Sequence, residues 1–152
     1  MDSEQVILHL TINRKKFVET TEFSSQPGIY AFFYNGGALP YISEIIPENE
    51  IIYIGKTESS QKKRNAQTHF KSGKTGSSTV RKSFGSLLKE KMSLLPVPRN
   101  ETDFIKGRLS HFKFDENSER KLTDWMNLNL SISFFEFPKS KQEIEELESK
   151  II

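Results

Sequence analysis

Two short apolar runs dominate the first third of the chain, and turn-forming residues border the first of them. Residues 28–34 (GIYAFFY) are aromatic and β-branched and lie between Pro27 and an Asn-Gly-Gly sequence, which predicts a strand ending in a turn. Residues 51–55 (IIYIG) predict a second short strand. Residues 38–50 contain two prolines and predict a long loop. Two strands joined by one loop most simply pair as an antiparallel hairpin.

The pattern changes to a helical one after Gly55. Residues 60–71 predict a polar helix, with Thr57 or Ser60 as its N-terminal cap. Apolar residues then recur at helical spacing in segments 79–91 and 116–130, and residues 140–152 predict a last helix. Residues 131–137 predict a strand, 104–114 should include one, and 6–12 fit a strand or a short helix.

This order of elements predicts an α/β (α+β) fold, with a small, partly antiparallel central sheet flanked by helices. The length of 152 residues corresponds to about one domain. The chain has no cysteine, which excludes disulfides and thiolate metal sites. No apolar run is long enough to span a bilayer, and the N-terminus lacks the pattern of a signal peptide, so we expect a cytoplasmic protein with no membrane partner.

The distribution of charge is more informative than the formal net charge of +2. Between residues 56 and 91 the chain has ten basic residues and only two acidic ones. Such a block is expected of a surface that binds phosphates, although a solvated helix surface is the alternative. A Gly-Lys-Thr sequence at 73–75 lacks the earlier glycine and the preceding strand of a P-loop, and the three histidines lack zinc-site spacing.

The triplets GIY (28–30) and YIG (53–55), on two adjacent predicted strands and followed by Arg64 and His69, resemble the GIY-YIG nuclease family. The resemblance covers residues 27–152, which we expect to form the nuclease domain, and leaves residues 1–26 as an N-terminal extension. It implies metal-dependent cleavage of DNA with Mg²⁺ or Mn²⁺. The family pattern usually continues to a supporting asparagine beyond the last helix, so we expect this domain to be truncated at its C-terminus.

The resemblance also implies roles for individual residues. Tyr30 would act as the general base or position the attacking water, with Tyr53 in support. Because a free phenol has a pKa near 10, nearby cations should favour its phenolate, and Lys56 and Arg64 are the candidates. Arg64 matches the catalytic arginine, whose planar guanidinium can bind two phosphate oxygens.

His69 departs from the spacing that an α-helix would require. A histidine four residues after Arg64 would share its face, but that position is Thr68. His69 is five residues on, roughly 140° around an α-helix. Either the helix ends before His69, or His69 belongs elsewhere in the site.

The family uses one glutamate on a later helix as its metal ligand, and two candidates fit. On the last helix, Glu148 falls within the apolar stripe, where a carboxylate is costly unless it is paired or binds a metal. The Leu147-Glu148 pair also matches the family pattern. Glu119, on the apolar side of the preceding helix, is the rival.

We expect phosphate contacts from the cations of the basic block, namely Lys62, Lys63, Lys71, Lys74, Arg81 and Lys82. Two other functions stay open at this point. One is a DNA-binding module that keeps the fold without catalysis, and the other is a protein-interaction domain whose basic block only faces solvent.

Overall fold

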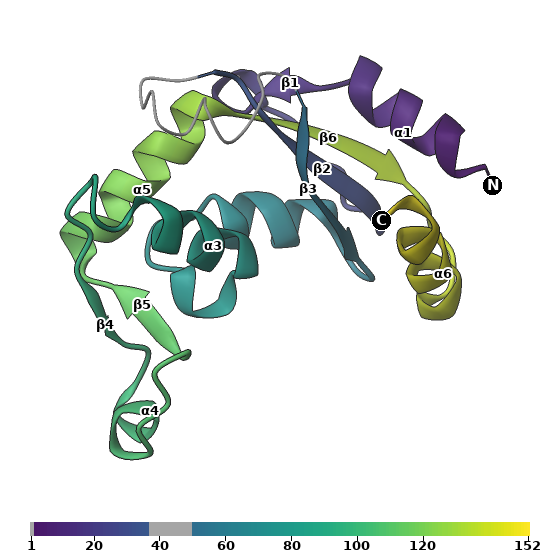
Figure 1. The fold of residues 1–152 in the computed structure, drawn as a ribbon. Helices are drawn as coiled ribbons and strands as arrows, with labels where there is room; N and C mark the ends of the chain where they lie inside the picture. The colour runs from purple at the N-terminus through teal and green to yellow at the C-terminus, as the bar shows by residue number, and fades with distance from the viewer. Residues whose placement is uncertain (1, 37–49) are drawn as a thin grey trace. The chain divides into compact units, whose positions relative to one another are not determined.

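The computed structural model describes residues 2–36 and 50–152, and its ribbon is drawn in Figure 1. The predicted loop at 38–50 falls almost wholly outside these residues. The chain divides into two compact units, one formed by Met1–Arg64 with Asn127–Ile152 and the other by Asn65–Met126.

The first unit contains a four-stranded antiparallel sheet with the strand order β1-β6-β2-β3. Its strands are β1 (Lys15–Lys16), β2 (Gly28–Tyr34), β3 (Ile51–Thr57) and β6 (Leu130–Glu136). The β2–β3 pair confirms the predicted hairpin. All seven residues of β2 are buried, as expected for a central strand covered on both faces.

Two helices, α1 (Ser3–Ile12) and α6 (Lys141–Ile151), pack on one face of this sheet. The core there combines alternate residues of β2 with apolar residues of both helices, namely Ile29, Ala31, Phe33, Val6, Leu10, Ile144, Leu147 and Ile151. A short 3₁₀ turn, η1 (Phe17–Glu19), follows β1. The segment predicted as a strand or a helix is therefore a helix, and it contributes to the core although it precedes the GIY triplet.

The second unit is mainly helical. It contains η3 (Thr75–Ser77), α3 (Thr79–Leu88) and α4 (Glu101–Ile105), with a two-stranded antiparallel pair formed by β4 (Pro96–Pro98) and β5 (Phe112–Phe114). Two helices run across the boundary between the units: η2 (Lys62–His69) and α5 (Glu116–Asn129). The predicted helices at 79–91, 116–130 and 140–152 are present, and the predicted strand within 104–114 is β5.

Candidate active site

Pairing between β2 and β3 brings the two tyrosines of the motif together. Tyr30 lies opposite Gly55 and Phe32 lies opposite Tyr53, so both tyrosines project from the same face of the hairpin. Their rings are stacked, with centroids 6.1 Å apart. A Cβ atom at position 55 would lie 2.5 Å from the Tyr30 hydroxyl, so only glycine leaves room for that hydroxyl.

The Tyr30 hydroxyl interacts with Arg64 and with Tyr53. Burial raises the pKa of Tyr30 well above its ordinary value and Tyr53 raises it further, while hydrogen bonding and charge from Arg64 act in the opposite direction. The residue is only 1% exposed. The expectation that cations make Tyr30 a phenolate is therefore wrong for this conformation, because burial has the larger effect and keeps the phenol protonated.

Gly28 shows a second close approach, where the GIY triplet meets β6. Its φ is +155°, and a Cβ atom at this position would overlap the carbonyl oxygen of Phe135, so the site excludes any side chain. This glycine lets β2 lie against β6 and so fixes the position of Tyr30 two residues later.

Arg64 is positioned by the start of η2, which follows β3. The Ser60 hydroxyl accepts a hydrogen bond from the Lys63 amide at 3.3 Å, so Ser60 serves as the N-terminal cap. The Gln61 side chain donates to the Ile29 carbonyl oxygen at 3.3 Å, which ties the helix to β2. Arg64 is half-buried and reaches the Tyr30 hydroxyl from this helix.

The helix that carries Arg64 is a π-helix rather than the predicted α-helix. Its backbone bonds connect residues five apart, as between the Phe70 amide and the Asn65 carbonyl oxygen at 3.0 Å. The five-residue spacing from Arg64 to His69 is thus one hydrogen-bonded step of this helix. The helix continues to His69, so the alternative in which it ends earlier is wrong.

His69 itself is buried in the second unit. Its Nδ1 atom lies 2.7 Å from the Ser78 hydroxyl, which also accepts a hydrogen bond from the Arg81 amide as the N-terminal cap of α3. These contacts give His69 a structural role at the start of α3, and its predicted catalytic role stays a prediction.

Lys56 does not share the environment of the tyrosines. It pairs with Ile29 in the sheet and so projects from the face that carries α6. Its Nζ atom lies 2.6 Å from Glu58 Oε1 and 3.0 Å from Glu145 Oε1. Lys56 is not among the groups that shift the pKa of Tyr30, so its predicted role in favouring a phenolate is not supported.

Glu148 lies on α6, three residues after Glu145, and is half-buried. Within the described parts of the chain, no hydrogen bond or ion pair to its carboxylate is formed. Burial raises its pKa, Lys56 lowers it, and the neighbouring carboxylates of Glu145 and Glu58 raise it. Glu145 was not predicted to belong to this region, although its three-residue spacing from Glu148 places both on one side of the helix.

Glu119, the rival metal ligand, lies in the second unit, and both oxygens of its carboxylate accept hydrogen bonds from protein groups. Its Oε2 atom accepts hydrogen bonds from Arg81 at 2.7 Å, Thr75 at 2.8 Å and the Gly73 amide at 3.2 Å, and Oε1 accepts from the Phe114 amide at 3.1 Å. A carboxylate that accepts four hydrogen bonds and pairs with a buried guanidinium is already satisfied without a metal. Glu119 therefore stabilises the fold.

The same network changes the expected role of Arg81. Its side chain is fully buried and ion-paired with Glu119. Burial lowers the pKa of its guanidinium, and Glu119 raises it. Arg81 therefore cannot contact a DNA backbone in this structure, and it leaves the predicted set of phosphate contacts. Of the other predicted contacts, Lys82 is half-buried and the following are exposed: Lys62, Lys63, Lys71 and Lys74.

The residues around Glu148 fit a divalent cation only as part of an open site. Among the described residues, no group of three or more acidic, histidine or cysteine side chains could hold a metal ion. A single half-buried carboxylate suits Mg²⁺, which usually keeps several waters and takes one or two carboxylates together with substrate phosphates. Glu148 is the available carboxylate of this kind.

No helix in residues 2–36 and 50–152 has the length and apolar character needed to cross a membrane. Searches of curated proteins and of solved structures each found no match. A family model described as the GIY-YIG catalytic domain matches residues 28–152, which include both triplets, Arg64 and Glu148. That domain is a nuclease domain that acts on nucleic acid and generally depends on a divalent metal. The match and the α+β fold show that the chain belongs to the GIY-YIG nuclease family.

Proposed function

We propose that the chain is a metal-dependent endonuclease that hydrolyses phosphodiester bonds of DNA. The observation that supports this most directly is the interaction of the Tyr30 hydroxyl with Arg64 beside Tyr53. A phenol and a guanidinium at one point can orient a water molecule and bind a phosphate oxygen at the same time. Neither role requires ionised Tyr30.

Each residue of the proposed site has a distinct role. Tyr30, as a neutral phenol, holds the attacking water, and Tyr53 holds the Tyr30 ring. Arg64 stabilises the extra negative charge that develops on the phosphate in the transition state. Glu148 would hold the cation, which when bound neutralises the leaving oxygen and polarises the phosphate.

Strand β3 connects the two halves of this site. It contributes Tyr53 and Gly55 to the tyrosine face and Lys56 to the face of α6. Lys56, held by Glu58 and Glu145, would offset part of the negative charge around Glu148 when no cation is present. We infer that the scissile phosphate lies at the end of β3, within reach of both groups.

The test is cleavage of supercoiled plasmid DNA with excess chelator, and with Mg²⁺ or Mn²⁺ restored. We expect cleavage only with the cation, and a rate for Tyr30→Phe about 10² lower, the scale of a misplaced reactant, because the attacking water loses the hydroxyl that orients it. Tyr34→Phe removes a hydroxyl from the same buried strand and should keep the parent rate. Equal rates for Tyr30→Phe and the parent would refute the proposed mechanism.

The burial of Tyr30 favours one alternative, a DNA-binding module without catalysis, because Tyr30 is only 1% exposed to solvent in this conformation. That alternative predicts salt-dependent DNA binding by the parent with no cleavage under any metal condition. A protein-interaction domain predicts neither binding nor cleavage.

A further inference from the structure

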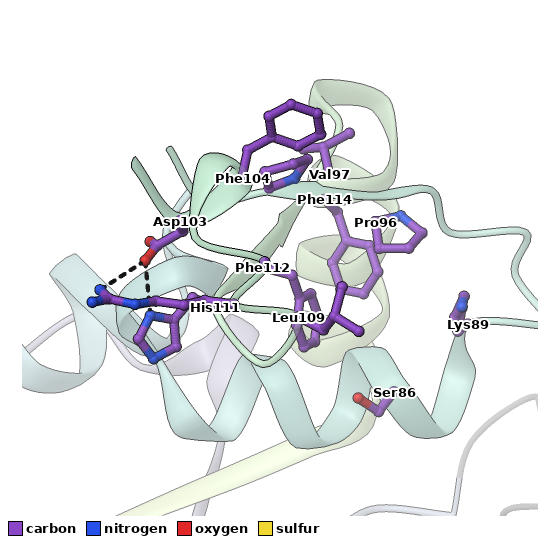
Figure 2. A pocket seen from close by; sticks show the side chains of 13 residues that line it. Ser86, Lys89, Pro96, Val97, Asp103, Phe104, Leu109, His111, Phe112 and Phe114 are labelled. Atoms are coloured by element: carbon purple, nitrogen blue, oxygen red, sulfur yellow. Dashed lines mark hydrogen bonds and ion pairs between the residues drawn. The ribbon is translucent and has the colours of Figure 1, made fainter. Parts of the chain in front are cut away.

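A cavity of about 600 Å³ lies entirely within the second unit. It is formed by the end of α3, the β4–β5 pair and the segment between those strands, and Figure 2 shows the side chains that line it. Its volume is in the range of pockets that bind small organic groups. No residue of the proposed catalytic site lines it.

The middle of the cavity is apolar and aromatic. Phe112 and Phe114 of β5 meet edge to face with ring centroids 5.5 Å apart, and Leu109 lies beside them in Figure 2. Two of the apolar lining residues are largely exposed, Phe104 at 69% and Leu109 at 89%. Exposed large apolar side chains around a hollow mark a binding surface rather than a folding core.

Polar groups lie at the ends of this apolar floor. Lys89 stands at one end in Figure 2, and Asp103 and His111 stand at the other. The Asp103 carboxylate is nearly buried and accepts contacts from Arg99 at 2.8 Å, Arg108 at 3.3 Å and His111 at 3.0 Å.

The charge at the cavity is positive. Two cations, Lys89 and Arg108, and one carboxylate, Asp103, line the cavity, which leaves one excess positive charge. Along residues 86–114 the chain has more basic than acidic side chains. The cavity therefore combines aromatic side chains with cations at its two ends, and its charge complements that of an anionic ligand.

We propose that this cavity binds an unpaired nucleotide of the nucleic-acid substrate. The base would stack on the aromatic floor, and the phosphates on either side would lie near Lys89 and Arg108. Any base can stack on an aromatic side chain. Proteins that bind single strands usually combine such stacking with cations along the phosphate backbone. The inference rests on the proposed function and assigns the substrate a single-stranded segment, such as a flap, a gap or a frayed end.

An acidic peptide is the competing ligand for an apolar cavity with a positive rim. The accessible rings of Phe104 and Phe112 favour the nucleotide, because a planar base can stack on the face of an aromatic ring. The chain also belongs to a nuclease family, and the matched residues 28–152 include this cavity, so a nucleic-acid ligand fits the rest of the chain.

The experiment measures the affinity of the full chain for two fluorescent probes by anisotropy, in chelator so that neither is cut. One probe is a single-stranded oligothymidylate, and the other is a blunt duplex. Phe104→Ser should weaken binding of the single strand at least about fivefold, the low end of the stacking range, and change duplex binding less than about twofold. Ile105→Ser is the matched control, since Ile105 is 73% exposed on the same helix but does not line the cavity.

A second variant tests the cations at the cavity. Lys89→Gln replaces an exposed charge and should reduce the salt dependence of single-strand binding by about 0.7 in slope, the value for one phosphate contact. Both substitutions are at exposed positions, and thermal midpoints equal to the parent will confirm that the fold is intact.

Four results would overturn the inference in different ways. Unchanged single-strand binding in both variants would show that the cavity does not bind the nucleotide. An acidic peptide would then be its ligand. Equal losses for both probes would exclude selectivity for an unpaired nucleotide. A parent chain that binds neither probe would remove the proposed function as well, whereas a parent that cuts duplex DNA while Phe104→Ser binds normally would overturn only this inference.

Discussion

The hydroxyl of Tyr30 is enclosed between β2, the backbone of Gly55 and the side chain of Arg64, and this enclosure determines its chemistry. The motif predicted correctly that Tyr30 and Tyr53 share one face and that Arg64 reaches Tyr30. It did not predict that Tyr30 stays a neutral phenol, because burial depends on how the whole chain packs around the hairpin and not on nearby residues in the sequence.

The first prediction concerns the space that Gly55 leaves. Gly55→Ala would place a methyl group 2.5 Å from the Tyr30 hydroxyl and 2.8 Å from the Tyr53 ring, so both side chains must shift. We expect a cleavage rate at least about tenfold lower and a loss of about 1–3 kcal/mol in stability, the usual cost of overpacking. Plasmid cleavage and urea denaturation measure the two effects.

The double variant Tyr30→Phe/Gly55→Ala separates the mechanism from general damage. If Gly55→Ala acts by displacing the Tyr30 hydroxyl, it should add little to the loss in cleavage that Tyr30→Phe already causes. Fully additive losses would show that Gly55 affects cleavage by another route.

The second prediction concerns Glu148 and the pH dependence of stability. Because burial raises the pKa of Glu148 above its ordinary value of 4.5, the folded chain keeps a proton at pH values where the unfolded chain has released it. The stabilisation from this proton is full below about pH 4.5 and is lost as the pH rises through the raised pKa. Glu148→Gln removes this dependence.

In metal-free buffer, Glu148→Gln should therefore match the parent in acid and be more stable than the parent at neutral pH. Its DNA cleavage should be lost, while DNA binding is retained or strengthened. Glu146→Gln, at an exposed position on the same helix, is the control and should change none of these properties. Thermal midpoints from about pH 4 to 8 provide the measurement, and a parent that is more stable than Glu148→Gln at neutral pH without metal would contradict this account.

At the scale of secondary structure, the helices and strands with regular apolar spacing were predictable from the sequence. The hairpin, α3, α5, β6 and α6 follow from period and turn residues alone. The π-helix η2 was not predictable, because a polar segment with few apolar residues does not reveal a period other than the usual α-helical one. The α-helical spacing applied to this segment produced the apparent mismatch between Arg64 and His69.

The ion pair between α3 and α5 was also hidden from the sequence. Arg81 and Glu119 are 38 residues apart, and no periodicity indicates that the two charges meet in a buried site. The basic block around Arg81 suggested an exposed role instead. A charge run shows where cations are concentrated, and only packing shows which of them point inward.

The third prediction tests this buried pair. Glu119→Gln leaves the Arg81 charge without a counterion in a site where both side chains are at most 2% exposed. We expect a loss of about 3–5 kcal/mol in stability, as for other buried pairs that lose one partner. Glu116→Gln, on the same helix with an 88% exposed side chain, should change stability by less than about 0.5 kcal/mol. At a temperature where Glu119→Gln stays folded, its cleavage rate should equal that of the parent, whereas loss of divalent-cation binding in this variant would identify Glu119 as a metal ligand.

At the scale of the whole molecule, the sequence predicted that the basic block binds nucleic acid. Packing reduces the number of its cations that can do so. Two of its ten cations, Arg81 and Lys56, are engaged by carboxylates at short distances, and Arg64 belongs to the proposed catalytic site. The exposed lysines are the cations that a phosphate backbone can reach, and their contribution should be electrostatic and independent of DNA sequence.

The last prediction measures that contribution by reversing Lys62, Lys63 and Lys74 together to glutamate. Each lysine that neutralises a phosphate of duplex DNA accounts for about 0.9 of the slope of log affinity against log salt, so the slope should fall by up to about 3 units. The thermal midpoint should stay close to that of the parent, because exposed charges contribute little to stability. Lys15 and Lys16, exposed on β1 outside the basic block, provide a matched reversal that should leave the slope unchanged. An unchanged slope in the triple variant, or an equal change in the control, would show that DNA is bound elsewhere on the molecule.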